Sequence, residues 1–310
     1  MRGAKADALY GATGTYKTTQ IGIVADWLRT KFGKKTLLVS AENGGWQPIQ
    51  SLVDDGTVIA WPIRHRALNP IESMDLASQG YWPANNAVED PTARLVKLNE
   101  ETTSKIGLWA FEGLTSFGDY CLDTLQKRGA SLSQDPSYRY TEGGTTYSGG
   151  NMSYYSFVQS RIADYITNSH LLPSDYVLWT ALEAKGEEDR IPIFGPAIAG
   201  KKAISKVGQW VCNLLHMEVV VTEAKQDEVT KQLEIATKVW MYLRPHADPV
   251  SKIVFPAKVR APFQYATEVP SKMEPDLAKL YEYLNKLRER ASAANQPKPA
   301  QTTQAAKGAQ

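Results

Sequence analysis

The sequence has little cysteine and no long apolar run. Its 310 residues include only Cys121 and Cys212, a pair too sparse for a disulfide framework and without the spacing of a metal-binding motif. No stretch approaches the roughly eighteen consecutive apolar residues of a membrane-spanning helix, and the first residues lack the apolar core of a secretory signal. We therefore expect a cytoplasmic protein with no membrane partner.

The chain also lacks an excess of charge of either sign. Its 35 Lys and Arg side chains stand against 33 Asp and Glu, which gives a net charge of +2. This balance excludes a polybasic protein that binds nucleic acid by charge alone, and it leaves DNA contact through a local site open. The four histidines share no spacing typical of a metal site or a catalytic triad, and we assign no chemistry to them: His65, His170, His216 and His246.

What the chain does contain is enough apolar sequence for a sizeable core, since 43% of its residues are hydrophobic and 22% are charged. Short apolar runs typical of buried strands alternate with stretches whose apolar residues recur at helical spacing. The expected strands are 8–10, 36–40, 58–61, 106–111, 176–180 and 217–221, and the expected helices are 18–28, 91–104, 114–128, 153–170 and 203–214. The alternation predicts an α/β fold with a mostly parallel sheet flanked by helices, and a pair at 232–244 and 252–255 is expected to add an antiparallel edge.

The domain organisation follows from where this alternation stops. Residues 1–265 are expected to form one core, interrupted by insertions near 62–90 and 129–152 and by a further segment at 184–202. Residues 266–291 are expected to contain a charged C-terminal helix. The Ala, Gln, Pro and Lys residues of 292–310 cannot build a core, and we expect a flexible tail there.

The first strand and helix are joined by a sequence typical of a phosphate-binding loop. The pattern requires glycine, four residues, a second glycine, lysine, and then serine or threonine. The chain matches every fixed position except the second glycine, where Tyr16 stands. The residues expected to bind the nucleotide are Gly11, Ala12, Thr13, Gly14, Thr15, Tyr16, Lys17, Thr18 and Thr19. An ordinary strand-to-helix turn with an incidental lysine is the alternative.

The residue types of this loop fit a nucleoside triphosphate with Mg2+. Backbone N–H groups of a tight turn at a helix N-terminus converge on phosphate oxygens, and Gly11 and Gly14 permit the turn. Lys17 is expected to reach the β- and γ-phosphates and Thr18 to ligate Mg2+, while Thr19 is expected to donate to the α-phosphate. ATP is favoured over GTP because the chain has no Asn-Lys-x-Asp motif for reading guanine.

Polar residues that follow later strands are candidates to act on the nucleotide. Glu42, after strand 36–40, is placed to activate the attacking water, or is a solvated acid that opens a turn. Glu112, after strand 106–111, is placed to hold the Mg2+ shell, or complements a helix dipole. Thr180 is placed to sense the γ-phosphate, or is a satisfied strand-end hydroxyl, and Glu183 is a weaker candidate.

Six segments, taken in order, resemble the RecA-like P-loop ATPases of tailed phages, including the Sak-type single-strand annealing group. These segments are 11–19, 40–42, 110–117, 179–181, 195–202 and 257–260. The resemblance implies a RecA-like core in which Glu42 is the catalytic glutamate and Glu112 the Walker B acid. It also implies that Lys258 and Arg260 act on the nucleotide of a neighbouring subunit, and hence a homo-oligomer. Tyr16 and Glu112 depart from the family's usual glycine and aspartate, so nucleotide binding is better supported than rapid hydrolysis.

The resemblance further implies that loops 128–152 and 184–206 face DNA. Cations and aromatic rings that suit single-stranded DNA occur at Arg128, Tyr138, Arg139, Tyr140 and Tyr147. Acids that oppose such contact occur at Glu142, Glu183, Glu187, Glu188 and Asp189. A disordered or partner-binding loop is the alternative.

The expected function is that of an ATP-binding and ATP-hydrolysing phage protein of DNA recombination or single-strand annealing, in the host-cell cytoplasm. One alternative is a nucleotide-binding switch or assembly protein with little turnover and no DNA binding. A small-molecule kinase is a third reading, for which the chain offers no arginine-rich lid segment.

Overall fold

The computed structural model describes most of the chain. The described residues are 5–42, 44–63, 70–132, 139–142, 145–148, 151–188, 191–198, 201–226, 233–248 and 251–294. The expected flexible tail lies outside them, apart from residues 292–294, which end the last helix. Within the described ranges, no helix combines the length and the apolar character that crossing a membrane requires.

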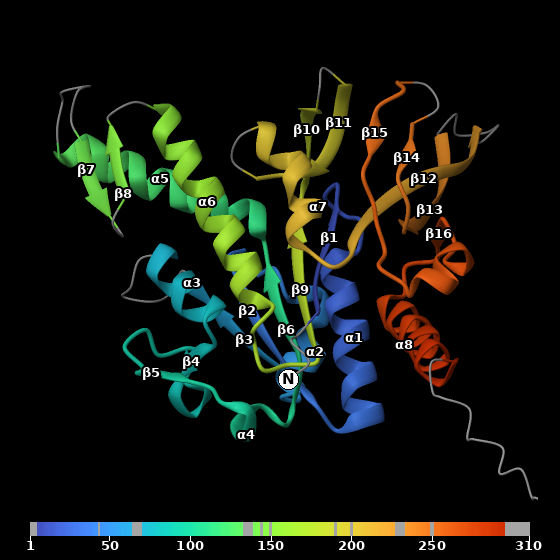
Figure 1. Cartoon of the computed structure of the whole chain (residues 1–310), viewed down its shortest axis with the longest axis horizontal. Helices are drawn as coiled ribbons and strands as arrows, with labels where there is room; N and C mark the ends of the chain where they lie inside the picture. The colour runs from blue at the N-terminus through green and yellow to red at the C-terminus, as the bar shows by residue number, and fades with distance from the viewer. Residues whose placement is uncertain are drawn as a thin grey trace, which may run out of the picture.

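An eight-stranded sheet forms the centre of the molecule (Figure 1), in the order β16-β13-β12-β1-β9-β6-β2-β3. Its strands are β1 (Lys5–Gly11), β2 (Lys35–Ser40), β3 (Val58–Pro62), β6 (Ile106–Glu112), β9 (Tyr176–Ala181), β12 (Leu214–Gln226), β13 (Leu233–Tyr242) and β16 (Lys272–Met273). The six strands from β12 to β3 run parallel, and β13 and β16 add an antiparallel edge. This mostly parallel α/β sheet was predicted from the sequence. Every residue of β6 and β9 is buried, as expected for strands covered on both faces.

The first face of the sheet is covered by α1 (Lys17–Phe32), α2 (Gln50–Asp54) and α8 (Leu277–Ala294). Apolar residues at helical spacing, among them Ile21, Val24 and Leu28, pack on Leu9 and Leu38 of the sheet. C-terminal helix α8 belongs to the same core, since Leu277, Leu280, Tyr281, Leu284 and Leu287 are buried in it.

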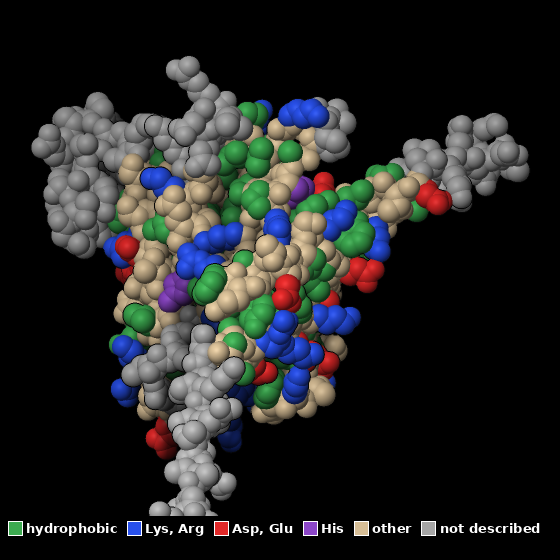
Figure 2. All heavy atoms as spheres, turned by 45° about the vertical axis from the view of Figure 1, so that its right-hand side comes forward, with side chains coloured by type: hydrophobic (Ala, Val, Ile, Leu, Met, Phe, Trp, Pro, Cys, Tyr) green, Lys and Arg blue, Asp and Glu red, His purple; other side chains and the backbone are tan. Residues whose placement is uncertain are grey.

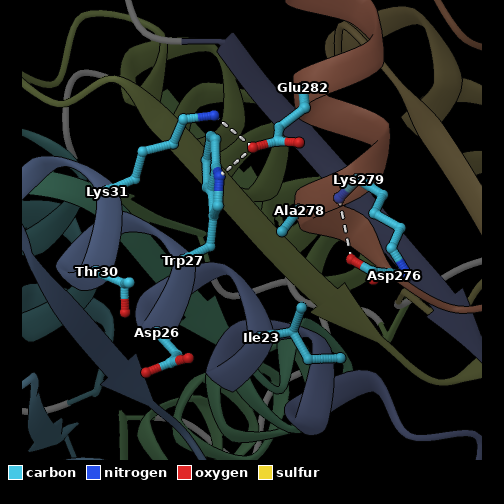
Figure 3. A pocket seen from close by; sticks show the side chains of 9 residues that line it. All are labelled: Ile23, Asp26, Trp27, Thr30, Lys31, Asp276, Ala278, Lys279 and Glu282. Carbon is cyan, nitrogen blue, oxygen red and sulfur yellow. Dashed lines mark hydrogen bonds and ion pairs between the residues drawn. The ribbon is translucent and has the colours of Figure 1, made fainter.

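Polar contacts hold α8 against α1. Buried Gln20 accepts a hydrogen bond from the backbone N–H of Leu277 (2.9 Å) and donates one to the carbonyl of Pro275 (3.0 Å). At the surface, the Trp27 indole N–H and the Lys31 ammonium both reach the Glu282 carboxylate, at 2.9 and 2.6 Å (Figure 3). The buried Gln20 contacts fix the helix more firmly than the exposed ion pair, whose contribution is at most about 1 kcal/mol.

The opposite face is covered by α3 (Pro70–Ser78), α5 (Leu114–Leu132), α6 (Asn151–Ser169) and α7 (Val207–Trp210). Large aromatic side chains fill this layer. The rings of Trp61 and Trp109 each meet the Trp82 ring edge to face, at centroid distances of 5.4 and 5.8 Å. Phe111 stacks on Trp179 at 4.0 Å. These contacts tie neighbouring strands and the segment after α3 into one rigid support for the sheet.

A smaller sheet and two hairpins complete the structure. The smaller sheet has the order β10-β11-β15-β14 and contains β10 (Glu183–Glu188), β11 (Ile191–Pro196), β14 (His246–Ala247) and β15 (Val254–Phe255). It continues from the carboxyl end of β9, above the central strands in Figure 1. The hairpins are β4 (Tyr81–Pro83) with β5 (Leu95–Lys97), and β7 (Arg139–Glu142) with β8 (Thr145–Ser148). Short 3-10 turns lie at Gln47–Ile49, Ala84–Asn86, Lys201–Lys206 and Phe263–Glu268.

Three sequence expectations were wrong in detail. The segment 91–104 is not one helix: it forms strand β5, which pairs with β4, and then the four-residue helix α4 (Glu100–Thr103). Residues 252–255 do not pair with 232–244, because β15 joins β11 and β14 of the smaller sheet while β13 pairs with β12. The segment 203–214 is not one helix: it contains the end of a 3-10 turn, the four-residue helix α7 and the first residue of β12. In the first two cases strand pairing with other parts of the chain overrides the local pattern.

Candidate functional site

The loop between β1 and α1 has the compact turn that its glycines predict. A Cβ atom on Gly11 would lie 2.3 Å from the carbonyl oxygen of Met217, so only glycine lets β12 approach this closely. Gly14 has a φ of +81°, in the left-handed region that glycine favours. The Thr15 hydroxyl is buried and donates to the carbonyl of Ala12 at 2.8 Å, which closes the turn.

Tyr16 occupies the position where the phosphate-loop pattern has its second glycine. Its backbone adopts the left-handed conformation, with φ 63° and ψ 26°. Its side chain is 57% exposed and therefore leaves the interior of the loop free. The backbone thus keeps the conformation for which glycine is usual, at a steric cost of roughly 1 kcal/mol for a residue with a Cβ.

Lys17 lies folded over this loop. Its ammonium donates hydrogen bonds to the carbonyls of Gly11 (2.8 Å) and Ala12 (2.7 Å), and it lies 3.3 Å from the Thr15 hydroxyl. Burial lowers the pKa of Lys17, and the nearby carboxylates of Glu42, Glu183 and Glu112 oppose that shift. Among the described residues, the hydrogen-bond partners of this ammonium are neutral oxygens, which leaves its charge available to an anionic ligand.

The first turn of α1 offers backbone donors to the same space. Tyr16, the N-cap residue, makes no side-chain hydrogen bond to the helix, and no acid occurs in the first turn. The first N–H groups of any α-helix have no partner within the helix, and the dipole of this 16-residue helix favours negative charge at this end. The turn is therefore suited to phosphate oxygens.

Thr18, Glu112 and Ser40 form a connected polar group beside Lys17. The Thr18 hydroxyl donates a short hydrogen bond to one carboxylate oxygen of Glu112, and the Ser40 hydroxyl donates to the other at 3.2 Å. Glu112 is 3% exposed. Burial raises the pKa of Glu112, as does the charge of Glu42, while the bonds from Thr18 and Ser40 and the charge of Lys17 lower it. The sequence did not single out Ser40, although its place as the last residue of β2 was a usable signal.

Glu42 and Thr180 reach the same edge of the sheet. A Cβ atom on Gly113, the residue after β6, would lie 2.7 Å from Cγ of Glu42, so this acid sits directly beside the end of β6. The Thr180 hydroxyl accepts a hydrogen bond from the backbone N–H of Gly113 at 3.2 Å. Thr180 is therefore a strand-end residue whose hydroxyl has a hydrogen-bond partner, which was one of the two alternatives from the sequence. Its side chain also lines the cleft.

These residues line one cleft of about 670 Å³, within the range of about 300–1,000 Å³ typical of small-molecule sites. The lining consists of Thr13, Gly14, Thr15, Tyr16, Lys17, Thr18, Thr19, Glu42, Pro48, Glu112, Ser116, Tyr120, Thr180 and Leu182. The structure thus gathers the loop, both candidate acids and Thr180 from the carboxyl ends of β1, β2, β6 and β9.

Lys258 and Arg260 lie elsewhere. Lys258 pairs with Leu214 in an antiparallel bridge, and Leu214 lies opposite Ala8, three residues before the glycine that ends β1. The backbone N–H of Arg260 donates to the side-chain oxygen of Asn213 at 2.9 Å. Burial lowers the pKa of Lys258, and the charge of Arg260 adds to this shift. Neither residue lines the cleft of its own chain.

The candidate DNA-binding side chains lie outside what the structure describes. The backbone of Arg128 belongs to α5 and that of Arg139 to β7, but their side chains are outside the described residues, as are those of Tyr140 and Tyr147. Tyr138 and Asp189 fall in undescribed segments. On the face shown in Figure 2, Lys and Arg side chains lie among acidic and apolar ones.

No protein-family model matches the chain, and a search of the curated proteins returned no match.

Proposed function

We propose that this protein binds ATP with Mg2+ as a P-loop nucleotide-binding protein of the RecA-like class and hydrolyses it. The carrying observation is the contact between Thr18, in the first turn of an uncapped helix, and Glu112 at the end of β6, with the Lys17 ammonium beside them. This arrangement brings a cation, free backbone donors and a hydroxyl–carboxylate pair into one cleft. Each of these groups has a partner in a Mg2+-bound triphosphate.

The residues present fit Mg2+. Thr18 and Glu112 offer hard oxygen atoms, and Ser40 holds the second oxygen of the carboxylate. Mg2+ in nucleotide sites uses one or two protein oxygens and takes its remaining ligands from phosphates and water. When bound, the ion would neutralise charge on the β- and γ-phosphates.

Glu42 is the residue we propose as general base. It lies beside the end of β6 and in the same cleft as Thr18 and Lys17, as a base that takes a proton from the attacking water must. Lys17 neutralises phosphate charge, and the loop N–H groups orient the phosphates. On the sequence resemblance, Lys258 and Arg260 would contribute from a neighbouring subunit. Neither lines the cleft of its own chain.

We place this activity in phage DNA metabolism, in recombination or single-strand annealing by a homo-oligomer, on the sequence resemblance. A nucleotide-binding switch with little turnover is the second candidate. It is favoured by Tyr16 and Glu112, which stand where the family that the sequence resembles has glycine and aspartate, so nucleotide binding is better supported than rapid hydrolysis.

Calorimetric titration of ATP into the parent protein and Lys17→Ala tests the site. Lys17→Ala is expected to bind at least tenfold more weakly, about 1.4 kcal/mol. The control is Lys31→Ala, which removes an exposed lysine from the last turn of the same helix and is expected to bind like the parent. Equal affinity in a folded Lys17→Ala protein would overturn the proposal. Hydrolysis assays with and without single-stranded DNA then separate the DNA-metabolism role from the switch.

A further inference from the structure

Three side chains from two sheets converge next to the strand that carries the phosphate loop. His216 and Glu218 belong to β12 of the main sheet, and His246 begins β14 of the smaller sheet. Nδ1 of His216 lies 3.3 Å from Nε2 of His246, which lies 3.5 Å from a carboxylate oxygen of Glu218. All three candidate ligand atoms lie within 4.8 Å of one another.

We propose that His216, Glu218 and His246 form a binding site for a divalent transition-metal ion of the Zn2+ type. Zn2+ binds histidine nitrogen and carboxylate oxygen at about 2.0–2.2 Å, so two ligand atoms of a tetrahedral site lie about 3.3–3.5 Å apart. The two shorter separations here match that edge. Imidazole ligands favour Zn2+ and its neighbours over Mg2+ and Ca2+, which prefer all-oxygen sites.

The hydrogen bonds of His216 determine which of its ring nitrogens carries a free lone pair, and that nitrogen, Nδ1, faces this site. Nε2 of His216 lies 3.0 Å from a carboxylate oxygen of Glu183, and a carboxylate can only accept, so Nε2 carries the proton. Nδ1 is then left with its lone pair, facing His246. In zinc sites a carboxylate commonly accepts a hydrogen bond from the outer nitrogen of a ligating histidine, which fixes the tautomer and raises the basicity of the ligand.

Hydrogen bonding from His246 cannot serve both of its neighbours, although Glu218 also forms a side-chain hydrogen bond with Tyr242. Nε2 of His246 faces two acceptors, Nδ1 of His216 and the Glu218 carboxylate, and it can carry one proton for both. The other nitrogen of His246, Nδ1, is buried and has no hydrogen-bond partner among the described residues. A cation at the centre would satisfy all three converging lone pairs at once.

Aromatic contacts fix the histidine rings of this site, and one side of the site is open to solvent. The His216 side chain is 1% exposed, whereas the side chains of His246 and Glu218 are 17% and 30% exposed. Phe255 stacks on His216 and on His246, and Tyr242 stacks on His246 at 3.5 Å, which fixes both imidazole rings. An ion can therefore enter from the Glu218 side and keep a water molecule as its remaining ligand.

The ion would fasten the smaller sheet to the main one beneath the phosphate loop. His216 lies opposite Tyr10, the residue before Gly11, and their rings are 4.7 Å apart. The Tyr10 hydroxyl in turn donates to the carbonyl of Pro256, just after β15, at 2.7 Å. Metal binding to residues of both sheets would stabilise the folded state by mass action.

Metal binding is tested on full-length protein freed of metal by a chelator and then dialysed. Zn2+ is titrated against a chromophoric chelator, and Co2+ absorption reports the coordination geometry. The parent is expected to bind one Zn2+ per chain and to show raised thermal stability and the intense visible bands of tetrahedral Co2+. His246→Ala and Glu218→Gln are expected to lose this binding, and Glu183→Gln to weaken it about 10- to 100-fold.

The controls separate this site from the proposed nucleotide site. Glu223→Gln removes an exposed acid from the same strand and is expected to bind Zn2+ like the parent. Lys17→Ala and excess Mg2+ are likewise expected to leave Zn2+ binding unchanged, so the metal site stands or falls independently of ATP binding. Absence of stoichiometric binding by the folded parent, or equal binding by folded His246→Ala and Glu218→Gln, would overturn the proposal.

Discussion

The hydroxyl of Thr18 in the first turn of α1 donates a hydrogen bond to the carboxylate of Glu112, which lies 94 residues further along the chain at the end of β6. The bond joins the phosphate loop to the strand that supplies the nearest buried acid. Ser40 holds the other oxygen of that acid, so the carboxylate has a fixed orientation before any ligand arrives. The cleft is thus organised by its own hydrogen bonds around the position that we assign to Mg2+.

Glu112→Gln should raise the Mg2+ concentration needed for half-maximal ATP hydrolysis at least tenfold, about 1.4 kcal/mol. The amide keeps the shape and can still accept from Thr18, but it lacks the charge that attracts the ion. Affinity for ATP without Mg2+ should stay unchanged. Magnesium titrations of the steady-state rate measure the effect, with Glu112→Asp as the variant that keeps the charge. An unaltered Mg2+ requirement in Glu112→Gln would remove Glu112 from the metal site.

Glu42→Gln should retain ATP and lose most turnover. The amide occupies the same space beside Gly113 but cannot accept a proton, and loss of a general base costs on the order of 10²-fold or more. Single-turnover assays with saturating protein separate the chemical step from ATP binding. If hydrolysis stays within about threefold of the parent, well below that range, Glu42 is a turn residue only.

Arg260→Ala should bind ATP normally and hydrolyse it poorly, because we assign its charge to the nucleotide of a neighbouring subunit. An arginine that acts in trans contributes on the order of 10³-fold or more in related phosphoryl transfer. Mixing Arg260→Ala with Lys17→Ala should restore part of the activity, since some interfaces then pair an intact loop with an intact arginine. A mixture that co-assembles on size-exclusion chromatography and remains inactive contradicts the trans role.

Asp7→Asn should stabilise the protein at neutral pH. Asp7 is fully buried in β1, and burial raises its pKa from 3.8 to about 6, against the opposing hydrogen bonds from Asn213. Well below pH 3.8 the carboxyl is protonated in both folded and unfolded chains, so its ionisation has no effect on stability there. Between pH 4 and 6 the unfolded chain loses the proton first and the free energy of unfolding falls, by roughly 3 kcal/mol once both states are ionised.

Urea denaturation from pH 4 to pH 7.5 measures this effect. The parent should lose stability over that interval relative to Asp7→Asn, whose side chain stays neutral at every pH of the titration. The control is Glu289→Gln, which removes an exposed carboxylate from α8. If the free energy of unfolding of the parent and of Asp7→Asn changes with pH in the same way, ionisation of Asp7 does not destabilise the folded protein, and the prediction is wrong.

The sequence allowed the α/β class, the six parallel strands and the tight turn between β1 and α1 to be predicted, because each is encoded by residues close together in the chain. Tyr16 seemed to break the loop pattern, yet its backbone takes the left-handed turn and its ring points outward. Thr18 and Glu112 were each assigned to a Mg2+ site from the sequence, and their direct contact is consistent with the rule that parallel strands end at one edge.

The remaining features depend on pairing between distant residues. From the sequence, Ser40 is only the last residue of a strand. Its hydrogen bond to Glu112 depends on the pairing of β2 with β6, which the local sequence does not reveal. His216 and His246 lie 30 residues apart on different sheets, so their spacing carries no metal-site signal. The hydrophobic spacing of residues 91–104 predicts a helix. It does not reveal that β5 pairs with β4, and this pairing makes part of the segment a strand.

The position of β1 in the sheet has a consequence for the order in which the protein is made. Its only neighbours in that sheet are β9 and β12: Ala8 pairs with Trp179 on one side and with Leu214 on the other. At about 5–20 residues per second, a ribosome needs on the order of 10–40 s to pass from the first of these residues to the last. Before β9 is made, the strand that bears the proposed phosphate loop has neither neighbour, and it gains the second only when β12 follows. Its apolar Leu9 and Tyr10 are open to chaperones until then. The proposed nucleotide site therefore forms only after strands far along the nascent chain have been made.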